Sequence, residues 1–184
     1  DFDTPGRTML GSDQKQWFKN AVTSSSARWK IWGSQVMVMA LDLPLGKHAN
    51  PDQWDGYGAE RSEILNHFRD RKVDNFAVLS GDIHTFFAGN LSTNGQITGN
   101  PVGVEFGGGS MTSLGIPEAV DFSPEALASL IPANDPHIEF ADFSHRGYGV
   151  ATVKYDEMSC KLRGVKTTLE PESSPVTLAE FRVP

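Results

Sequence analysis

Residues 75–84 read NFAVLSGDIH, and they place two metal-binding residue types directly after an apolar run. The run has the length and composition of a buried β-strand, and Gly81 lets the chain turn sharply at its end. Asp82 and His84 are two positions apart, so on an extended chain they point to one face, with Cα atoms roughly 7 Å apart. Metal ligands at the carboxyl end of a buried strand match the usual place of sites in α/β sheets. The stretch therefore predicts a site for one metal ion or an adjacent pair, with a turn-capping Asp82 and a surface His84 as the alternative.

Helical and extended patterns alternate around this strand. Apolar residues recur at helical spacing in some segments, and Val, Ile, Phe and Trp gather in others. We expect helices at 11–27, 59–72 and 123–134, the first of them capped by Ser12 or Asp13. We expect extended segments at 28–43 with a break at Gly33, at 75–81 and at 101–107, and a hairpin over 84–99 that turns at Asn94 and Gly95. The last forty or so residues alternate strands with turns. The chain is therefore expected to be one domain, residues 1–184, of the α/β class with antiparallel strands toward the C-terminus.

Charge and composition exclude some classes of function. The formal net charge of −7 argues against nucleic acid as a partner, because a protein that binds the phosphate backbone shows a basic surface. A small phosphate ester is still allowed, since it needs only a local positive centre such as metal ions. No apolar run approaches 18 residues, so no membrane span is expected. Cys160 is the one cysteine and gives neither an internal disulfide nor a zinc-finger spacing.

Two loops draw attention for their composition. Residues 44–58, PLGKHANPDQWDGYG, form an expected loop of unusual length, and such loops are often functional. Residues 107–110, GGGS, suggest a phosphate cradle, but no lysine or helix start follows them, so a flexible turn is the expected structure.

The stretch LSGDIH resembles the last metal-binding block of calcineurin-like metallophosphoesterases. Most of that superfamily has Gly-His-x-His there, and the form with Asp82 resembles the PhoD family of alkaline phosphatases and phosphodiesterases. Other stretches resemble blocks of this family in the same order: RTMLGSDQKQWF (7–18), SSARWKIWGSQVMV (25–38), DQWDGYGAER (52–61), VEFGGGSMTS (104–113) and NDPHIEFADFSHRGYGVATV (134–153). The resemblance runs from about residue 7 to about residue 166, which is most of the chain.

The resemblance implies a fold and an activity. The fold would be the C-terminal part of a metallophosphoesterase αββα sandwich whose N-terminal half is absent from this sequence. The activity would be hydrolysis of phosphate monoesters and diesters by a metal-activated hydroxide, with iron and calcium as the metals and zinc or manganese as possible replacements. The resemblance also implies a periplasmic or secreted location.

The resemblance also implies roles for particular residues. Asp82 and His84 match metal-ligand positions. Asp52 and Asp55 lie in the matching loop, and one of them, with Asp55 preferred, is expected to bind a metal or its water; a turn shaped by the aspartate side chain is the alternative. Trp54 and Tyr57 are expected to line the mouth of the site, or else to pack within the loop.

Further polar residues are weaker candidates. Arg146 is expected to contact substrate phosphate with its two-pronged guanidinium, unless it is an ordinary surface arginine. Glu105 is expected to support the site by accepting hydrogen bonds behind the ligands, or else to face water on an edge strand. The remaining histidines have weaker cases still: His48, His67, His137 and His145.

Three hypotheses about function remain open. The first is the phosphatase and phosphodiesterase activity, with this chain inactive alone because the other metal-binding blocks of the superfamily are missing: the sole GD pair is in SGDIH, and the GN pairs are followed by Leu91 and Pro101. The second is a hydrolase of the same fold for another ester, such as a nucleotide or a phospholipid head group. The third is a degenerate, non-catalytic α/β binding module. An uncovered apolar face is expected to pair with the missing half or with a second copy.

Overall fold

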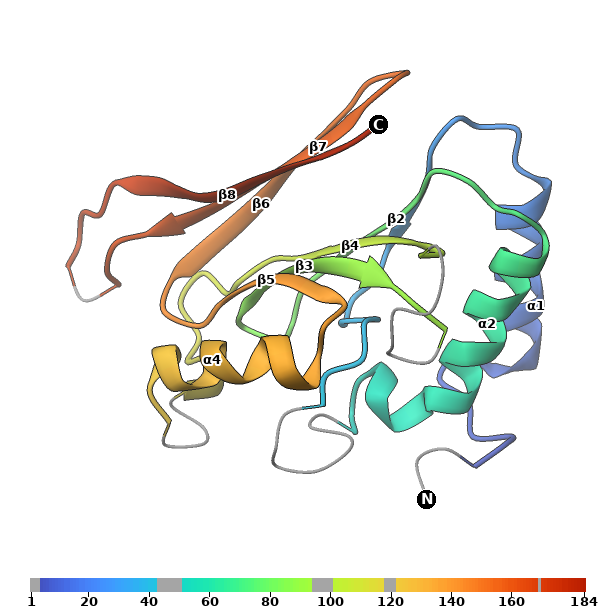
Figure 1. Cartoon of the computed structure of the whole chain (residues 1–184), viewed down its shortest axis with the longest axis horizontal. Helices are drawn as coiled ribbons and strands as arrows, with labels where there is room; N and C mark the ends of the chain where they lie inside the picture. Colours follow the sequence, from blue (N-terminus) through green and yellow to red (C-terminus); the bar gives the residue numbers. More distant parts are fainter. Residues whose placement is uncertain (1–3, 43–50, 94–100, 118–121, 169) are drawn as a thin grey trace.

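The computed structural model describes residues 4–42, 51–93, 101–117, 122–168 and 170–184. These residues form two β-sheets and a layer of helices (Figure 1). The expected hairpin turn at Asn94 and Gly95 and the candidate His48 lie outside the described residues. The helices among the described residues are all too short or too polar to cross a bilayer.

The larger sheet has five strands in the order β1-β2-β4-β3-β5. Three strands, β1 (Lys30–Gly33), β2 (Phe76–Ser80) and β4 (Gly103–Gly107), run parallel to one another. Two more, β3 (Phe86–Leu91) and β5 (Ile138–Asp142), extend the sheet by antiparallel pairing. The parallel strands end together at one edge of the sheet, and the segment with Asp82 and His84 leaves from that edge.

The second sheet is an antiparallel meander of the last three strands. It consists of β6 (Arg146–Val153), β7 (Met158–Val165) and β8 (Pro175–Val183), in that order. Apolar residues on its inner face, Met158, Cys160 and Leu162, pack against Phe86 and Phe106 of the five-stranded sheet. The two sheets therefore lie face to face, as the upper and middle layers of Figure 1.

Three helices cover the other face of the five-stranded sheet: α1 (Gly11–Ser24), α2 (Gly58–Asp70) and α4 (Pro124–Asn134). Aromatic rings join the layers, since Phe18 of α1 lies 4.6 Å from Trp32 and 5.5 Å from Phe68 between ring centroids. The order helices, sheet, sheet is a mixed α/β fold with an antiparallel C-terminal sheet, as the sequence predicted. The second helical layer of an αββα sandwich is not formed by the described residues.

One local expectation was wrong. Ser12 or Asp13 was expected to cap α1, but both lie inside the helix, and Glu60 of α2 instead accepts from the backbone amides of Met9 and Leu10. The segment 28–43 was expected to be extended with a break at Gly33, and its ladder covers 30–33 and ends at that glycine. Beyond Ser34 it leaves the sheet and runs through the core without pairing as a strand.

Candidate active site

Asp82 and His84 both have left-handed backbone conformations, with φ angles of 68° and 57°. This corrects the extended geometry expected from the sequence, so the argument that alternate residues share a face does not apply. Asp and His tolerate the left-handed region better than most residues, yet each such position still costs about 1–3 kcal/mol unless its surroundings stabilise it. Two strained residues directly after a buried strand are typical of functional sites.

Asp82 is exposed, and one buried side chain holds it. The amide of Gln53, which is 3% exposed, donates from Nε2 to Asp82 Oδ2 over 2.9 Å. Gln53 belongs to the segment before the short 3-10 helix η1 (Trp54–Tyr57), so the hydrogen bond joins this loop to the end of β2. Among the described residues, Gln53 alone hydrogen-bonds to Asp82, and it uses one carboxylate oxygen. The other oxygen of Asp82 is therefore the one placed to accept a ligand.

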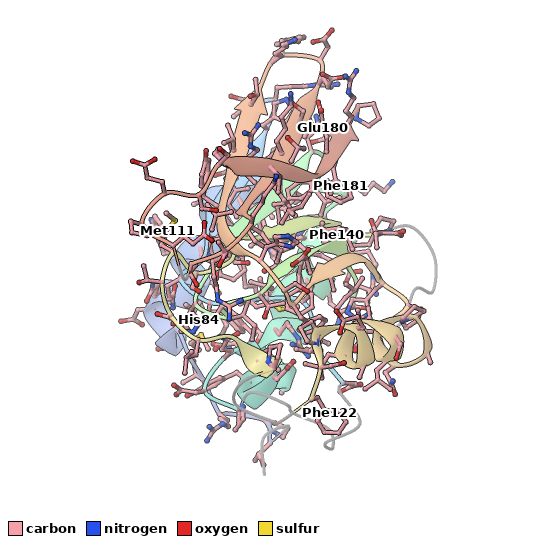
Figure 2. All side chains as sticks on the ribbon, turned by 90° about the vertical axis from the view of Figure 1, so that its left-hand side faces the viewer. His84, Met111, Phe122, Phe140, Glu180 and Phe181 are labelled. Atoms are coloured by element: carbon pink, nitrogen blue, oxygen red, sulfur yellow. The ribbon has the colours of Figure 1, made fainter. Side chains whose placement is uncertain are left out.

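The imidazole of His84 is oriented by the backbone of a neighbouring loop. Its Nδ1 lies 2.8 Å from the carbonyl oxygen of Leu114. A carbonyl can only accept, so Nδ1 carries a proton, and in the neutral form of the ring the lone pair is on Nε2. Histidines that bind metals are commonly oriented in this way by a carbonyl on the other ring nitrogen. His84 lies on the near face in Figure 2, on the same side of the molecule as the exposed Met111.

Arg146, at the start of β6, reaches the same loop. It is 8% exposed, so it is not an ordinary surface arginine. Its Nε donates to the carbonyl of Ser113 over 2.8 Å, one residue before the carbonyl that orients His84. A Cβ at Gly115 would lie 2.9 Å from Arg146 Nη2 and 3.2 Å from the carbonyl oxygen of His84. The loop 113–115 therefore passes tightly between Arg146 and His84, and the structure brings these two residues together.

Asp55 has a different environment from Asp82. It is 6% exposed, its Oδ1 lies 2.7 Å from Arg61 Nη1, and its Oδ2 accepts from the amide of Leu41 over 3.3 Å. Burial raises the pKa of Asp55, and the charge of Arg61 opposes that rise. Asp52, three residues earlier, is exposed. The preferred carboxylate of the loop is thus in a buried ion pair, and the other is open to solvent.

The two aromatic residues of the loop, Trp54 and Tyr57, make packing contacts within the protein. Trp54 is 1% exposed and packs edge-on against Trp32, with ring centroids 5.5 Å apart. Tyr57 is half-buried, and the guanidinium of Arg7 lies 4.6 Å from its ring centroid. The structure therefore places Trp54 in the core and not at the mouth of a site, because its indole fills the space between the helices and the sheet.

Glu105 supports the strand end from within the core. It is 0% exposed and lies on β4, a central strand, so the alternative of an edge residue in water was wrong. Its carboxylate accepts from the amides of Val38 and Met39 over 2.9 and 2.6 Å, and from Ser80 Oγ over 2.5 Å. Burial raises the pKa of Glu105, while these three donors favour its charged form. It thereby fixes the last residue of β2, two positions before Asp82.

The other histidines that the structure describes make no side-chain hydrogen bond to Asp82 or His84. His137 is 1% exposed, with Nε2 2.8 Å from the carbonyl of Ala40, and burial lowers its pKa. His145 pairs with Asp142 over 2.8 Å. His67 is in α2, and burial lowers its pKa too.

Sequence reasoning missed Gln53 and the loop 113–115. Gln53 stands inside the quoted DQWDGY stretch, but only the carboxylates and aromatic residues there were considered. An amide between two aspartates at a loop end was a signal that could have been used. The role of Leu114 had no signal in the sequence, because it acts through a backbone carbonyl that any residue provides.

The metal-binding capacity of this site is partial. Within residues 4–42, 51–93, 101–117, 122–168 and 170–184, no group of three or more His, Cys, Asp and Glu side chains is arranged to hold a metal ion. Asp82 and His84 together offer a carboxylate and an imidazole, which suit the harder and borderline metals respectively. The pair fits part of a metal site, and the remaining ligands would have to come from elsewhere.

Comparison with known proteins identifies the class of this α/β protein with its strand-end site. A solved structure entitled "Structure of PhoD" superposes with a TM-score of 0.82 at 32% sequence identity, covering 97% of this chain and 34% of that one. Alkaline phosphatase D of Bacillus subtilis (strain 168) is 34% identical over 182 residues, which is 96% of this chain and 30% of that protein. The first of these relatives is named for PhoD, and the second is named as an alkaline phosphatase.

The family model for PhoD-like phosphatases matches residues 1–162. The chain belongs to the PhoD-like phosphatase family. It spans about a third of the length of the relatives it matches.

Proposed function

We propose that this chain forms part of a metal-dependent phosphoesterase that hydrolyses phosphate monoesters and diesters. The observation that carries the proposal is the pairing of Asp82 with an oriented His84. The imidazole has its proton on Nδ1, toward Leu114, and its lone pair on Nε2, and a free carboxylate oxygen of Asp82 lies two residues away. The membership of the PhoD-like family supports the same reaction class.

Asp82 and His84 would hold metal, with Asp52 or Asp55 as a further ligand. Asp52 is exposed, whereas Asp55 would have to share its carboxylate with Arg61. Iron and calcium are the proposed metals, and zinc or manganese could replace them. When bound, such ions supply activation of a water molecule and neutralisation of phosphate charge.

The remaining chemistry belongs to the side chains of this chain. Gln53 holds one oxygen of Asp82, so the other oxygen faces the ligand in a fixed direction. Arg146 is proposed to contact the equatorial phosphate oxygens, on which charge gathers during phosphoryl transfer. Gly115 lies against both this guanidinium and the His84 backbone, since a Cβ there would lie 2.9 Å from Arg146 Nη2 and 3.2 Å from the His84 carbonyl oxygen. A periplasmic or secreted location is proposed from the family resemblance alone.

The test uses Asp82→Asn and His84→Ala in the complete polypeptide that carries these residues. Each variant should lose more than about a hundredfold in turnover of a phosphodiester, because loss of an outer partner of a metal ligand already costs 10–100-fold. Elemental analysis should show reduced metal content, and the unfolding temperature should stay close to that of the unaltered protein. Exposed Asp13→Asn in α1 is the matched control and should change none of the three. Near-normal turnover and metal content in either variant would overturn the proposal.

The 184-residue chain alone gives a second test. We expect no turnover of a phosphodiester with added iron, calcium, zinc or manganese, since two or three ligands bind metal weakly. Mass determination must exclude a co-purifying fragment. Robust metal-dependent turnover by this chain alone would mean that the site is complete within it.

A further inference from the structure

Two large apolar side chains stand in solvent on residues 108–115, the loop that follows β4. Met111 is 61% exposed and Leu114 is 72% exposed, and we call these two side chains the apolar rim. Single exposed apolar residues are normal on protein surfaces, but apolar side chains gathered at one place often mark a binding site. In Figure 2, Met111 and His84 are on the same face of the molecule.

The apolar rim is continuous with the residues of the candidate active site. The carbonyl oxygen of Leu114 lies 2.8 Å from Nδ1 of His84. The Cβ of Leu114 is three bonds from that oxygen, so its side chain begins within about 7 Å of the imidazole. Arg146, which is proposed to contact phosphate, donates to the carbonyl of Ser113, the preceding residue. An alkyl group of a few carbons on a phosphate held at this site can therefore reach the rim.

Hydrogen bonds fix the loop that carries the rim. Its start is tied to β2, because the amide of Gly108 donates to the carbonyl of Ser80 over 2.9 Å. Its middle is tied to β6, because the carbonyl of Ser110 accepts from the amide of Gly147 over 2.7 Å. The hydroxyl of Ser110 donates to the carbonyl of Ser113 over 2.8 Å and closes the turn. The rim is thus preformed, and a preformed surface loses less conformational entropy when it binds a ligand.

The chemistry of this loop favours an uncharged and apolar ligand group. Residues 107–115 read GGGSMTSLG and include no charged side chain. An alkyl group gains free energy when it leaves water for such a surface, whereas an ether or hydroxyl group loses hydrogen bonds to water there. The flexible thioether of a methionine adapts to groups of different shape. The rim should therefore select by apolarity more than by exact shape.

We propose that Met111 and Leu114 form a subsite for the ester group of the substrate, so that the preferred phosphodiesters are those of apolar alcohols. The inference rests on the proposed function and names its substrate class. In the hydrolysis of such a diester, water attacks phosphorus, one bond from phosphorus to an alkyl oxygen breaks, and the products are the alcohol and a phosphate monoester. The rim exchanges no bond and acts by binding the alkyl group.

The experiment compares dibutyl phosphate with bis(2-methoxyethyl) phosphate, using the complete metal-loaded polypeptide that carries these residues. The two esters are nearly equal in size, because an oxygen replaces one methylene of each chain. Each is symmetric, so the same group meets the rim whichever ester bond breaks. Phosphorus NMR would follow the monoester product. We expect kcat/KM to be about tenfold higher for dibutyl phosphate, since one fully buried methylene is worth roughly fourfold and the ether oxygen also loses hydrogen bonds to water.

Polar variants of similar size make the test specific. Met111→Gln and Leu114→Asn should each lower the ratio of the two kcat/KM values about threefold, and the double variant should bring the ratio near one. The ratio is the readout because a disturbed His84 would lower turnover of both esters by the same factor. Tyr155→Gln is the matched control. Tyr155 is 82% exposed beyond the end of β6 that is opposite to Arg146, and its replacement should leave the ratio unchanged.

Turnover of bis(p-nitrophenyl) phosphate separates this inference from the proposed function. If this reference diester is hydrolysed but dibutyl phosphate is not preferred, or if the double variant keeps the preference, the inference alone is overturned. If the reference diester is not hydrolysed, the proposed function fails and the inference fails with it. An unchanged ratio with a lower unfolding temperature, or with loss of a dimer, would show that the rest of the polypeptide or a second copy covers the rim. That result would also overturn the inference.

Discussion

Carboxylates occupy two different settings in this protein. At the end of β2, Asp82 is exposed, strained and held by one described partner, Gln53. In the core, Glu60 and Glu105 are each at most 3% exposed, and each accepts several hydrogen bonds from backbone amides and hydroxyls. A carboxylate with all its partners inside the protein maintains the fold, whereas one with a free oxygen at a strand end is available for chemistry.

Asp55 belongs with the core residues on this criterion, because Arg61 and the amide of Leu41 hold its two oxygens. It was nevertheless the preferred metal ligand of its loop. The following predictions test the comparison, beginning with the largest effect.

Asp55→Ala should destabilise the folded protein by about 3 kcal/mol, because it leaves the charge of Arg61 without this partner in a largely buried position. Urea unfolding monitored by tryptophan fluorescence would measure the change. Asp52→Ala is the matched control in the same loop, and as an exposed substitution it should stay within about 0.5 kcal/mol. A stable Asp55→Ala protein that has lost metal would instead show that Asp55, like Asp82, is a carboxylate available for metal binding.

Asp135 is intermediate between the two settings, the buried carboxylates with partners and the exposed Asp82, and it therefore tests the comparison. It is 1% exposed, and its Oδ1 accepts from the amide of Asp42, but its Oδ2 has no partner among the described residues. Burial raises the pKa of Asp135 to about 6, and the nearby charges of Asp42 and Asp55 act in the same direction. Between roughly pH 4 and 6 the folded protein therefore holds a proton that the unfolded chain releases, so stability falls as the pH rises.

Asp135→Asn should remove this decline, which amounts to at most about 3 kcal/mol across the window. The measurement is the free energy of unfolding at several pH values for both proteins. His137, whose pKa is lowered by burial, contributes the opposite slope to both, so the difference between the proteins isolates Asp135. Parallel pH profiles would show that Asp135 is ionised in the folded protein throughout.

Glu105→Gln should cost about 2 kcal/mol, because the NH2 group that replaces one oxygen cannot accept, so either the Met39 amide or the pair formed by the Val38 amide and the Ser80 hydroxyl loses its acceptor. Thermal and urea unfolding would measure the loss. Glu139→Gln, on the exposed face of β5, is the control and should be nearly neutral. If both substitutions are neutral, the hydrogen bonds of Glu105 do not hold the end of β2.

The sequence predicted the elements better than the geometry of the site. The strand expected at 75–81 is observed at 76–80, and the helix expected at 123–134 begins at Pro124 with Ser123 as its cap. Both depend on local patterns of apolar and capping residues. The left-handed conformations of Asp82 and His84 were not predictable, because these residue types adopt that conformation only when the surrounding structure imposes it.

Tertiary partners account for the other differences. Glu105 occupies a central strand because β4 lies between β2 and β3. No short segment of the sequence specifies this order of strands. Asp55 pairs with Arg61 across the start of α2, at a spacing that no helical or strand periodicity favours. The residue types of the candidate site could therefore be predicted. The sequence could not show which of these side chains have all their hydrogen-bond and ion-pair partners inside the fold.

Arg146→Lys should give the smallest effect and tests whether Arg146 acts on the substrate or on the loop. A lysine keeps the charge but loses the planar guanidinium, so a phosphate contact should weaken, with kcat/KM reduced about tenfold. If Arg146 only holds Ser113, the loss should instead appear as lower stability and a disturbed His84, which NMR of the imidazole nitrogens would detect. Arg182→Lys, on the exposed edge of β8, should change neither. Unchanged kinetics with an unchanged imidazole spectrum would remove Arg146 from the site, and its burial would then serve the packing of β6 alone.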